Sequence, residues 1–374
     1  MAIALREMQN PVEDRPTRPP TEDPQVPAAD GGSRRAGGAS RPATPEDAPR
    51  LQVEYVEAAT PSALLAGDDV LAVFGFGSAA PGSLADPRYL RVPLEPHGHA
   101  SFELWRGGGP VTRGRDDGVR WASDGQLLFG AVEVPEGEGG ILEAARQAYA
   151  RLAAFTTGSR TPHLLRIWNY VDAITLGAGD DERYRAFCVG RARGLGDFDV
   201  QSLPAATAIG RCDGQRVVQV YWLAAMAPGT PVENPRQISA YRYPRQYGPQ
   251  PPSFARAMLP PPGSAMPLLL SGTAAIIGHT SMHDGELLAQ LAETFTNFNA
   301  LVGAARAQDP SLPEHFGPGT RLKVYVRDRH DLPLVADALD RRFGTAVPRL
   351  LLHAAICRRE LAVEIDGVHG RSFA

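Results

Sequence analysis

The chain has 374 residues, of which 43% are hydrophobic and 21% charged, a balance typical of a soluble globular protein with room for two domains. Its formal net charge of −4 gives no electrostatic reason to expect binding to nucleic acid or to an anionic membrane. The three cysteines, Cys188, Cys212 and Cys357, are widely spaced and odd in number, so we expect neither a disulfide framework nor a thiolate zinc site, and a reducing, cytoplasmic setting fits best.

Residues 1–49 are rich in Pro, Gly, Ala, Asp and Arg and contain almost no aromatic or β-branched residues. Such a segment cannot bury enough apolar surface to order itself, so we expect a disordered tail. Residues 1–8 lack the apolar core of a secretion signal, and no apolar run of the chain is long enough to span a membrane.

The folded part is expected to begin near Leu51, because residues 51–55 and 70–76 have the composition of β-strands. Gly75 and Gly77 resemble the start of a dinucleotide-binding loop. Ala80 stands where that motif needs its third glycine, so we reject a nucleotide site.

The rest of the chain shows one order of elements twice. In the first copy, hydrophobic spacing predicts helices and strands in the order 141–155, 164–170, 182–190, 203–209 and 216–222. In the second copy the corresponding segments are 286–302, 321–327, 332–343 and a closing hairpin that runs from Arg349 to Glu364. Such units pack helices on one face of a mixed sheet, which predicts an α+β fold. We expect a first unit at 50–225, a connector at 226–262 and a second unit at 263–374.

The closing hairpin carries the two candidate functional charges. Arg349 offers a planar guanidinium that matches a carboxylate. Glu364 alternates with Val363 and Ile365, so its side chain lies on the opposite face, and partial burial would raise its pKa and make it a proton donor. A solvent-facing glutamate on an edge strand is the alternative. We expect Arg349 and Glu364 to share one cavity.

The first copy lacks both charges at the aligned positions, where Ala205 and Gln219 stand. A structural pair of charges would have no reason to survive in one copy alone. This asymmetry predicts a single active site, in the second half of the chain.

The connector is unusually rich in tyrosine. If residues 239–247 are extended, one face carries the four side chains of Tyr241, Tyr243, Arg245 and Tyr247. Aromatic rings beside a guanidinium would form a wall for a flat, anionic ring acid. The alternative is that these tyrosines only cover the sheet.

Several long segments resemble the chorismatases, a family with a RidA-like (YjgF-like, chorismate-mutase-like) fold that cleaves chorismate to pyruvate and a ring acid. The matching segments are 166–170, 182–191, 233–248, 253–256, 271–274 and 357–361, and with the residues around Arg349 and Glu364 they cover most of the chain after Leu51. The resemblance implies two fused RidA-like units, with Arg349 holding a substrate carboxylate and Glu364 facing the same cleft. It also places Thr273, Ala274 and Cys357 at the substrate.

The reaction follows from the enol ether of chorismate. Its terminal methylene carbon is a weak base, so protonation needs an acid of raised pKa, and Glu364 is the candidate. Water attack would then give pyruvate and a dihydroxycyclohexadiene acid, whereas attack by the neighbouring ring hydroxyl would lead to a hydroxybenzoate. Cys357 resembles the hydroxybenzoate-forming members, so we favour 3-hydroxybenzoate, with 4-hydroxybenzoate possible. Neither route requires a cofactor.

Other functions and sites are less well supported by the sequence. An enamine or imine deaminase of the RidA type and a non-catalytic sensor of ring acids are the more distant alternatives. His279 and His283 have a spacing that could hold zinc on a helix, but glycines bracket them and no third ligand is evident, so we expect no metal site. The resemblance is compatible with a monomer or a homotrimer.

Overall fold

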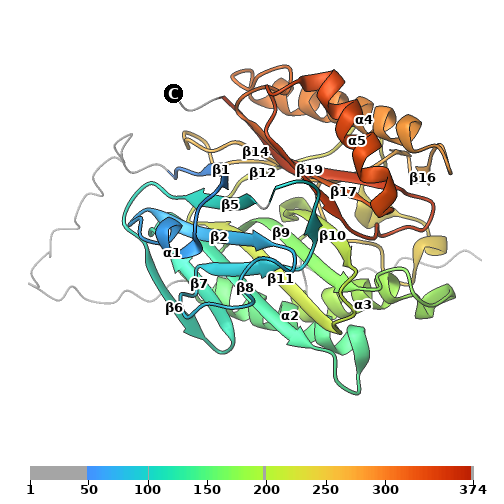
Figure 1. Ribbon diagram of the computed structural model, residues 1–374. Helices are drawn as coiled ribbons and strands as arrows, with labels where there is room; N and C mark the ends of the chain where they lie inside the picture. The colour runs from blue at the N-terminus through green and yellow to red at the C-terminus, as the bar shows by residue number, and fades with distance from the viewer. Residues whose placement is uncertain (1–48, 100, 197–198, 372–374) are drawn as a thin grey trace, which may run out of the picture. The chain divides into compact units, whose positions relative to one another are not determined.

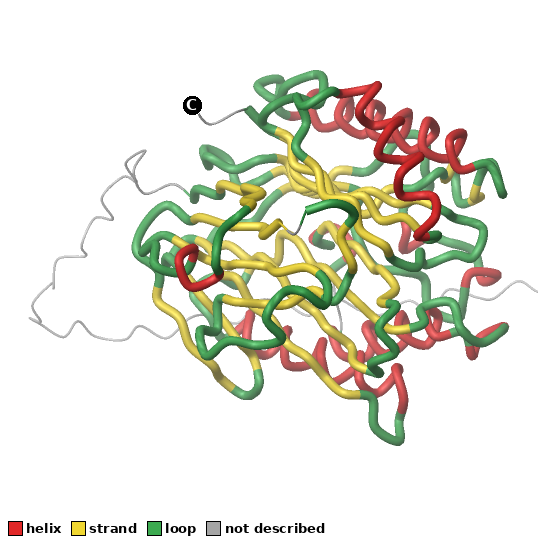
Figure 2. The backbone as a smooth tube through the Cα atoms, viewed as in Figure 1, coloured by secondary structure: helices red, strands yellow, loops and turns green. Residues whose placement is uncertain are grey.

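Three β-sheets each turn one face toward a shared core in the computed structural model, which describes residues 49–99, 101–196 and 199–371. The longer helices cover the other faces of the two larger sheets (Figures 1 and 2). The α+β prediction is therefore confirmed. The predicted tail lies outside the described residues, apart from Pro49.

The smallest of these three sheets has four strands in the order β1 (Gln52–Glu57), β5 (Ser101–Arg106), β2 (Val70–Phe76) and β3 (Tyr89–Val92), with the short helix α1 (Pro61–Leu64) beside it. The six-stranded sheet has the order β10 (Ala205–Arg211), β9 (His163–Asp172), β11 (Val217–Ala225), β8 (Leu127–Pro135), β7 (Val119–Ser123) and β6 (Thr112–Asp116). Helices α2 (Gly140–Thr157) and α3 (Arg183–Leu195) pack against this sheet.

The seven-stranded sheet has the order β12 (Thr230–Val232), β13 (Ala257–Leu259), β14 (Leu268–Thr273), β19 (Val363–His369), β17 (Thr320–Val326), β18 (Arg349–His353) and β4 (Glu95–Pro96). Helices α4 (Leu287–Gln308) and α5 (Leu332–Phe343) cover it, and a small hairpin joins β15 (Ile276–Ile277) to β16 (Thr280–Ser281). None of the helices in the described part of the chain combines the length and the hydrophobicity needed to cross a bilayer.

The two larger sheets repeat one topology. Strands β10-β9-β11-β8 and β18-β17-β19-β14 stand in the same order, with a parallel pair first and antiparallel pairs after it. The helices α2, α4 and α5 lie where the hydrophobic spacing predicts them. The predicted repetition of elements is present in the structure.

The predicted closing hairpin is wrong. Strands β18 and β19 do not pair with each other, because β17 lies between them and bonds to both. Residues 354–362 therefore cross the end of β17, where Ala354 N donates to Val326 O and Arg327 N donates to Ala362 O. This crossing, called the 354–362 connection below, leads the chain past the functional site.

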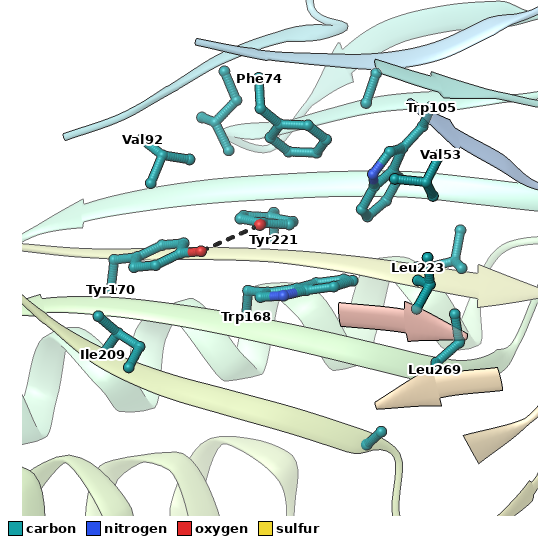
Figure 3. Packing of buried hydrophobic residues seen from close by; sticks show 14 of the residues in the cluster. Val53, Phe74, Val92, Trp105, Trp168, Tyr170, Ile209, Tyr221, Leu223 and Leu269 are labelled. Carbon is teal, nitrogen blue, oxygen red and sulfur yellow. Dashed lines mark hydrogen bonds between the residues drawn. The ribbon is translucent and has the colours of Figure 1, made fainter. Parts of the chain in front are cut away.

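Aromatic side chains fill the space between the four-stranded and six-stranded sheets (Figure 3). Tyr221 of β11 stacks on Trp168 with ring centroids 4.8 Å apart, and Phe74 of β2 lies 4.7 Å from Tyr221 on the other side. Trp105 of β5 closes the group, 5.2 Å from Trp168. This packing fixes β9 and β11, and through β9 it fixes the position of β10 at the site.

Helix α3 reaches the site because it packs very closely on α2. A Cβ atom on Gly190 would overlap the carbonyl of Leu142, and one on Gly194 would overlap the carbonyl of Arg146. Only glycine permits this approach of two backbones.

Candidate active site

A cavity of about 410 Å³ lies between the six-stranded and seven-stranded sheets. Its walls come from β10, β14, β19, helix α3, the segment 243–256 and the 354–362 connection. The lining residues are Glu182, Tyr184, Arg185, Arg191, Ala206, Thr207, Ala208, Tyr243, Gln246, Tyr247, Pro252, Phe254, Arg256, Gly272, Ala274, Ile276, Cys357, Arg358, Arg359, Glu360 and Glu364.

Glu364 is the buried member of the three glutamates that line this cavity, the others being Glu182 and Glu360. Its neighbours Val363 and Ile365 pack against the helices, so the alternation of β19 turns Glu364 the other way, where it is only 5% exposed. Burial, reinforced by the negative charge of Asp366, raises the pKa of Glu364 to about 8, while Arg166, Arg256 and Arg358 oppose the rise. The side chain is therefore a neutral carboxylic acid at neutral pH.

The carboxyl group of Glu364 occupies space that a glycine leaves free. A Cβ atom on Gly272 of β14 would overlap Glu364 Oε1. On its other side Glu364 Oε2 lies 3.9 Å from Cys357 Sγ. Burial raises the pKa of the Cys357 thiol well above its usual value, so this cysteine is a neutral neighbour of the acid.

A buried ionic cluster lies behind Glu364. Asp366 Oδ2 lies 3.2 Å from Arg166 Nη2 and accepts hydrogen bonds from Trp168 Nε1 and Tyr325 OH. Lys323 lies near it, with its Nζ 3.0 Å from Glu103 Oε2 and 3.9 Å from Asp366 Oδ1. The two cations and the two carboxylates compensate one another, which allows all four side chains to be buried.

Guanidinium groups and tyrosines form another part of the cavity wall. Arg358 lies over the ring of Tyr247, with Cζ 4.1 Å from the centroid, and donates to the carbonyl of His279 at 2.8 Å. Arg256 Nη2 donates to Tyr243 OH at 2.7 Å, and its buried Nε has no hydrogen-bond partner among the described residues. This wall offers positive charge and aromatic surface to an anionic ring.

Arg349 lies outside this cavity, so the expectation that it shares a cavity with Glu364 is wrong. Its guanidinium contacts the Asp340 carboxylate of α5 and donates to the carbonyls of Gly344 and Val347. Strand parity explains the placement, because Arg349 alternates with Leu350 and therefore shares the helix-covered face with Leu351.

Residues 239–247 are not extended, so the condition for a face shared by all four side chains is not met. The segment forms two single turns of 3₁₀ helix, Ala240–Arg242 and Arg245–Tyr247, separated by Tyr243 and Pro244. Tyr243 and Tyr247 still meet in the cavity wall, with ring centroids 5.4 Å apart.

Because of these turns, the other two predicted contact residues, Tyr241 and Arg245, do not line the cavity. Tyr241 lies beside Arg242 and does not line the cavity. Arg245 is 64% exposed and makes a two-bond ion pair with Asp180 at 2.6 and 2.8 Å.

Three further predicted residues lie on the strand and connection around Glu364. Ala274 and Cys357 line the cavity. Thr273 does not, because its buried hydroxyl donates to the carbonyl of Ser271 and its neighbour Gly272 faces the cavity instead. The structure thus brings Glu364, Tyr243, Tyr247, Ala274 and Cys357 together.

Sequence reasoning missed most of the cationic wall. Arg185 and Arg191 come from α3, Arg256 precedes β13, and Arg358 and Arg359 lie in the 354–362 connection. The signal was present, since these arginines fall inside the segments that resemble a known family. Their convergence depends on strand order, which the sequence pattern does not give.

The two histidines considered as zinc ligands have other partners. His279 Nδ1 lies 3.2 Å from Tyr247 OH, and His283 Nε2 lies 3.1 Å from a carboxylate oxygen of Glu293. Within residues 49–371, apart from the three that are not described, no group of three or more His, Cys, Asp or Glu side chains could hold a metal ion.

Comparison with known proteins identifies what this chain resembles. A family model described as "Chorismatase FkbO/Hyg5-like, N-terminal" matches residues 103–224. A chorismatase from Streptomyces rapamycinicus is 38% identical over 274 residues, which cover 71% of this chain and 81% of that protein. A 3-hydroxybenzoate synthase from Streptomyces hygroscopicus is 31% identical over 315 residues, 81% of this chain and 92% of the synthase. A crystal structure of a chorismatase matches with a TM-score of 0.76 at 33% identity, over 86% of this chain and 99% of the other.

Proposed function

Since the chain belongs to the chorismatase family and is an enzyme of that kind, we propose that it cleaves the enolpyruvyl ether of chorismate to pyruvate and a hydroxybenzoate, with Glu364 as the general acid. The favoured product is 3-hydroxybenzoate. The observation that carries the proposal is a buried neutral carboxylic acid, Glu364, in a cavity whose lining also includes five arginines.

The first step is transfer of the Glu364 proton to the terminal methylene carbon of the enol ether. This forms an oxocarbenium-like centre, and the glutamate left behind is an anion that stabilises it. The ring hydroxyl next to the ether then attacks the ring carbon that carries the ether oxygen. The bond between that carbon and the ether oxygen breaks, and its electron pair completes the carbonyl of pyruvate. The attacking oxygen's bond to its original ring carbon then breaks, and the carbon that gained the oxygen loses its proton, which gives the aromatic product. Of the two protons released, from the ring hydroxyl and from the ring carbon, one ends on the oxygen of the product and the other restores neutral Glu364.

Chorismate carries two carboxylates, so two cationic contacts are needed. Arg256 and Arg358 line the same cavity as Glu364, and Arg191 lines it from α3. All three can donate paired hydrogen bonds to a carboxylate. Tyr243 and Phe254 offer flat apolar surface to the ring. A cavity of about 410 Å³ is within the size range of small-molecule sites.

The choice of product depends on whether water reaches the oxocarbenium centre. Cys357 brings a thiol, and not a water-binding group, to within 3.9 Å of Glu364, which favours attack by the ring hydroxyl. The resemblance to a 3-hydroxybenzoate synthase supports the same outcome. The alternatives are 4-hydroxybenzoate and, if water attacks, a dihydroxycyclohexadiene carboxylate.

The test is incubation of the purified chain with chorismate, with pyruvate measured enzymatically and the ring product identified by mass and ultraviolet spectrum. We expect equal amounts of pyruvate and 3-hydroxybenzoate. Glu364→Gln should lower kcat at least about a hundredfold. The control Glu314→Gln changes a carboxylate that is 66% exposed and outside the cavity. Absence of pyruvate with the unaltered enzyme contradicts the proposal, and a diene diol as product contradicts the assignment of the hydroxybenzoate.

We infer that 50–225 and 263–374 are two RidA-like units, which their shared strand order supports. The cavity described above is built by one chain, so a monomer or a homotrimer could each hold it. Sedimentation equilibrium distinguishes the two.

A further inference from the structure

We propose that Thr207 is a substrate-contacting residue whose hydroxyl accepts a hydrogen bond from the ring hydroxyl beside the ether bond. The inference rests on the proposed function and adds a determinant of substrate recognition to it. Thr207 lies on β10, in the wall that the six-stranded sheet contributes to the cavity. It belongs to none of the segments that pointed to the site from the sequence.

The hydrogen-bond partners of Thr207 fix the direction in which its hydroxyl can act. Thr207 Oγ1 donates its single hydrogen to Asp366 Oδ2 at 2.8 Å. It accepts a hydrogen bond from Arg166 Nη2. A hydroxyl has one hydrogen and two lone pairs, so one lone pair remains for a group in the cavity. Thr207 can therefore accept from a substrate but cannot donate to it.

The surrounding side chains prevent the Thr207 hydroxyl from reversing the direction of its hydrogen bonds. Arg166 has no acceptor atom, so the Thr207 hydrogen cannot turn toward it. Asp366 is completely buried, with Arg166 Nη2 3.2 Å from its Oδ2 and Lys323 Nζ 3.9 Å from its Oδ1. Trp168 and Tyr325 occupy further directions around the same carboxylate oxygen as donors. The hydroxyl of Thr207 is thus held by buried groups that do not themselves line the cavity.

Thr207 also stands next to the acid. Its Oγ1 lies 3.3 Å from the position that a Cβ atom on Gly272 would take, and the same position overlaps Glu364 Oε1. A substrate whose enol methylene meets Glu364 therefore has its ring close to Thr207. In chorismate the ring hydroxyl is on the carbon adjacent to the ether, so the fixed acceptor would meet a donor.

A hydrogen bond of this kind has two consequences. It selects substrates with a hydroxyl on that ring carbon over analogues that have hydrogen or fluorine there, because only a hydroxyl can donate to Thr207. It also directs the hydroxyl oxygen's lone pairs away from Thr207 and toward the adjacent ring carbon, as the internal attack requires.

The experiment compares two ligands and three side chains. Binding is measured by calorimetry with Glu364→Gln enzyme, whose turnover of chorismate should be at least about a hundredfold slower. The ligands are chorismate and its analogue with hydrogen in place of the ring hydroxyl. With Thr207, chorismate should bind about tenfold more tightly than the analogue. Thr207→Val should bind both equally, and Thr207→Ser should restore the preference.

The proposal is overturned if the ratio of the affinities for chorismate and the analogue is the same with Thr207 and with Thr207→Val. It is also overturned if Thr207→Ser does not restore the preference for chorismate. Thr207→Ala serves as a second variant if the valine substitution reduces the Tm, and it should lose the preference as well. A general packing defect lowers the affinity for both ligands by the same factor and leaves the ratio of the two affinities unchanged. Failure of the proposed function is distinct, since then the unaltered enzyme releases no pyruvate from chorismate.

Discussion

The carboxyl group of Glu364 lies directly over the backbone of Gly272, in space that any side chain at position 272 would occupy. Strands β14 and β19 pair on either side of an irregularity in register between Leu270 and Thr273, which includes Gly272. The acid is therefore positioned by the absence of a side chain on the neighbouring strand. This relationship makes Gly272 a sensitive probe of the site.

Gly272→Ala should lower kcat at least about tenfold, because the added methyl group displaces the carboxyl group from its place in the cavity. Its matched control is Gly303→Ala on α4, where a Cβ atom would have no described atom within 4 Å and alanine favours the helix. The control should keep full activity and equal or greater Tm. Unchanged pyruvate release by Gly272→Ala would show that Glu364 does not need this position.

The rate should fall above about pH 8. Glu364 must be protonated to act as an acid, and burial raises its pKa to about 8, so kcat is expected to be level near pH 6 to 7 and to fall about tenfold per pH unit well above 8. Initial rates of pyruvate release across pH 5.5–10 measure this. A rate that rises through pH 8 would instead indicate a group acting as a base.

Stability should depend on pH through the same residue. The folded state keeps the Glu364 proton until its pKa of about 8, whereas the unfolded chain releases it near 4.5, so the folded state binds more protons between these values. The free energy of unfolding therefore falls as pH rises across that window. Relative to the unaltered enzyme, the Tm of Glu364→Gln should rise by about 5 °C between pH 5 and pH 9.

The exposed Glu314→Gln variant is the control for this comparison, and its Tm difference from the unaltered enzyme should be constant over the same range. A constant difference for Glu364→Gln as well would mean that Glu364 is ionised in the folded state at neutral pH.

Substrate affinity should depend on Arg256 and not on Arg349. Arg256 lines the cavity, so Arg256→Gln should raise KM for chorismate at least about tenfold, while the glutamine can still donate to Tyr243 OH. Arg349 points toward α5, so Arg349→Gln should change KM less than about twofold. A large rise in KM for Arg349→Gln with an unchanged Tm would contradict the placement of the guanidinium outside the cavity.

Much of the fold could be predicted from the local periodicity of hydrophobic residues. The stripe of Ile141, Ala145, Ala148 and Leu152 predicts α2, and these side chains are buried against the six-stranded sheet. The alternation of Val363 with Glu364 predicts which side of β19 the acid occupies. These features depend on a few neighbouring residues, so the sequence contains them.

Long-range order was not accessible in the same way. Two apolar strands joined by nine residues suggested a hairpin, but β17 lies between them, and its insertion depends on contacts distant in the chain. The hairpin in turn suggested that Arg349 and Glu364 meet, although their own strand parity separates them. The arginines of α3 and of the 354–362 connection could be assigned to one wall only once the two sheets were placed.

The proposed catalytic acid, Glu364, lies on β19 of the second repeat, and its cavity also needs residues from position 182 onward, in the first repeat. Both repeats must therefore fold against each other before any turnover can begin. A product that lacks β19 would have no proton to give, so pyruvate release would report that the two repeats have assembled.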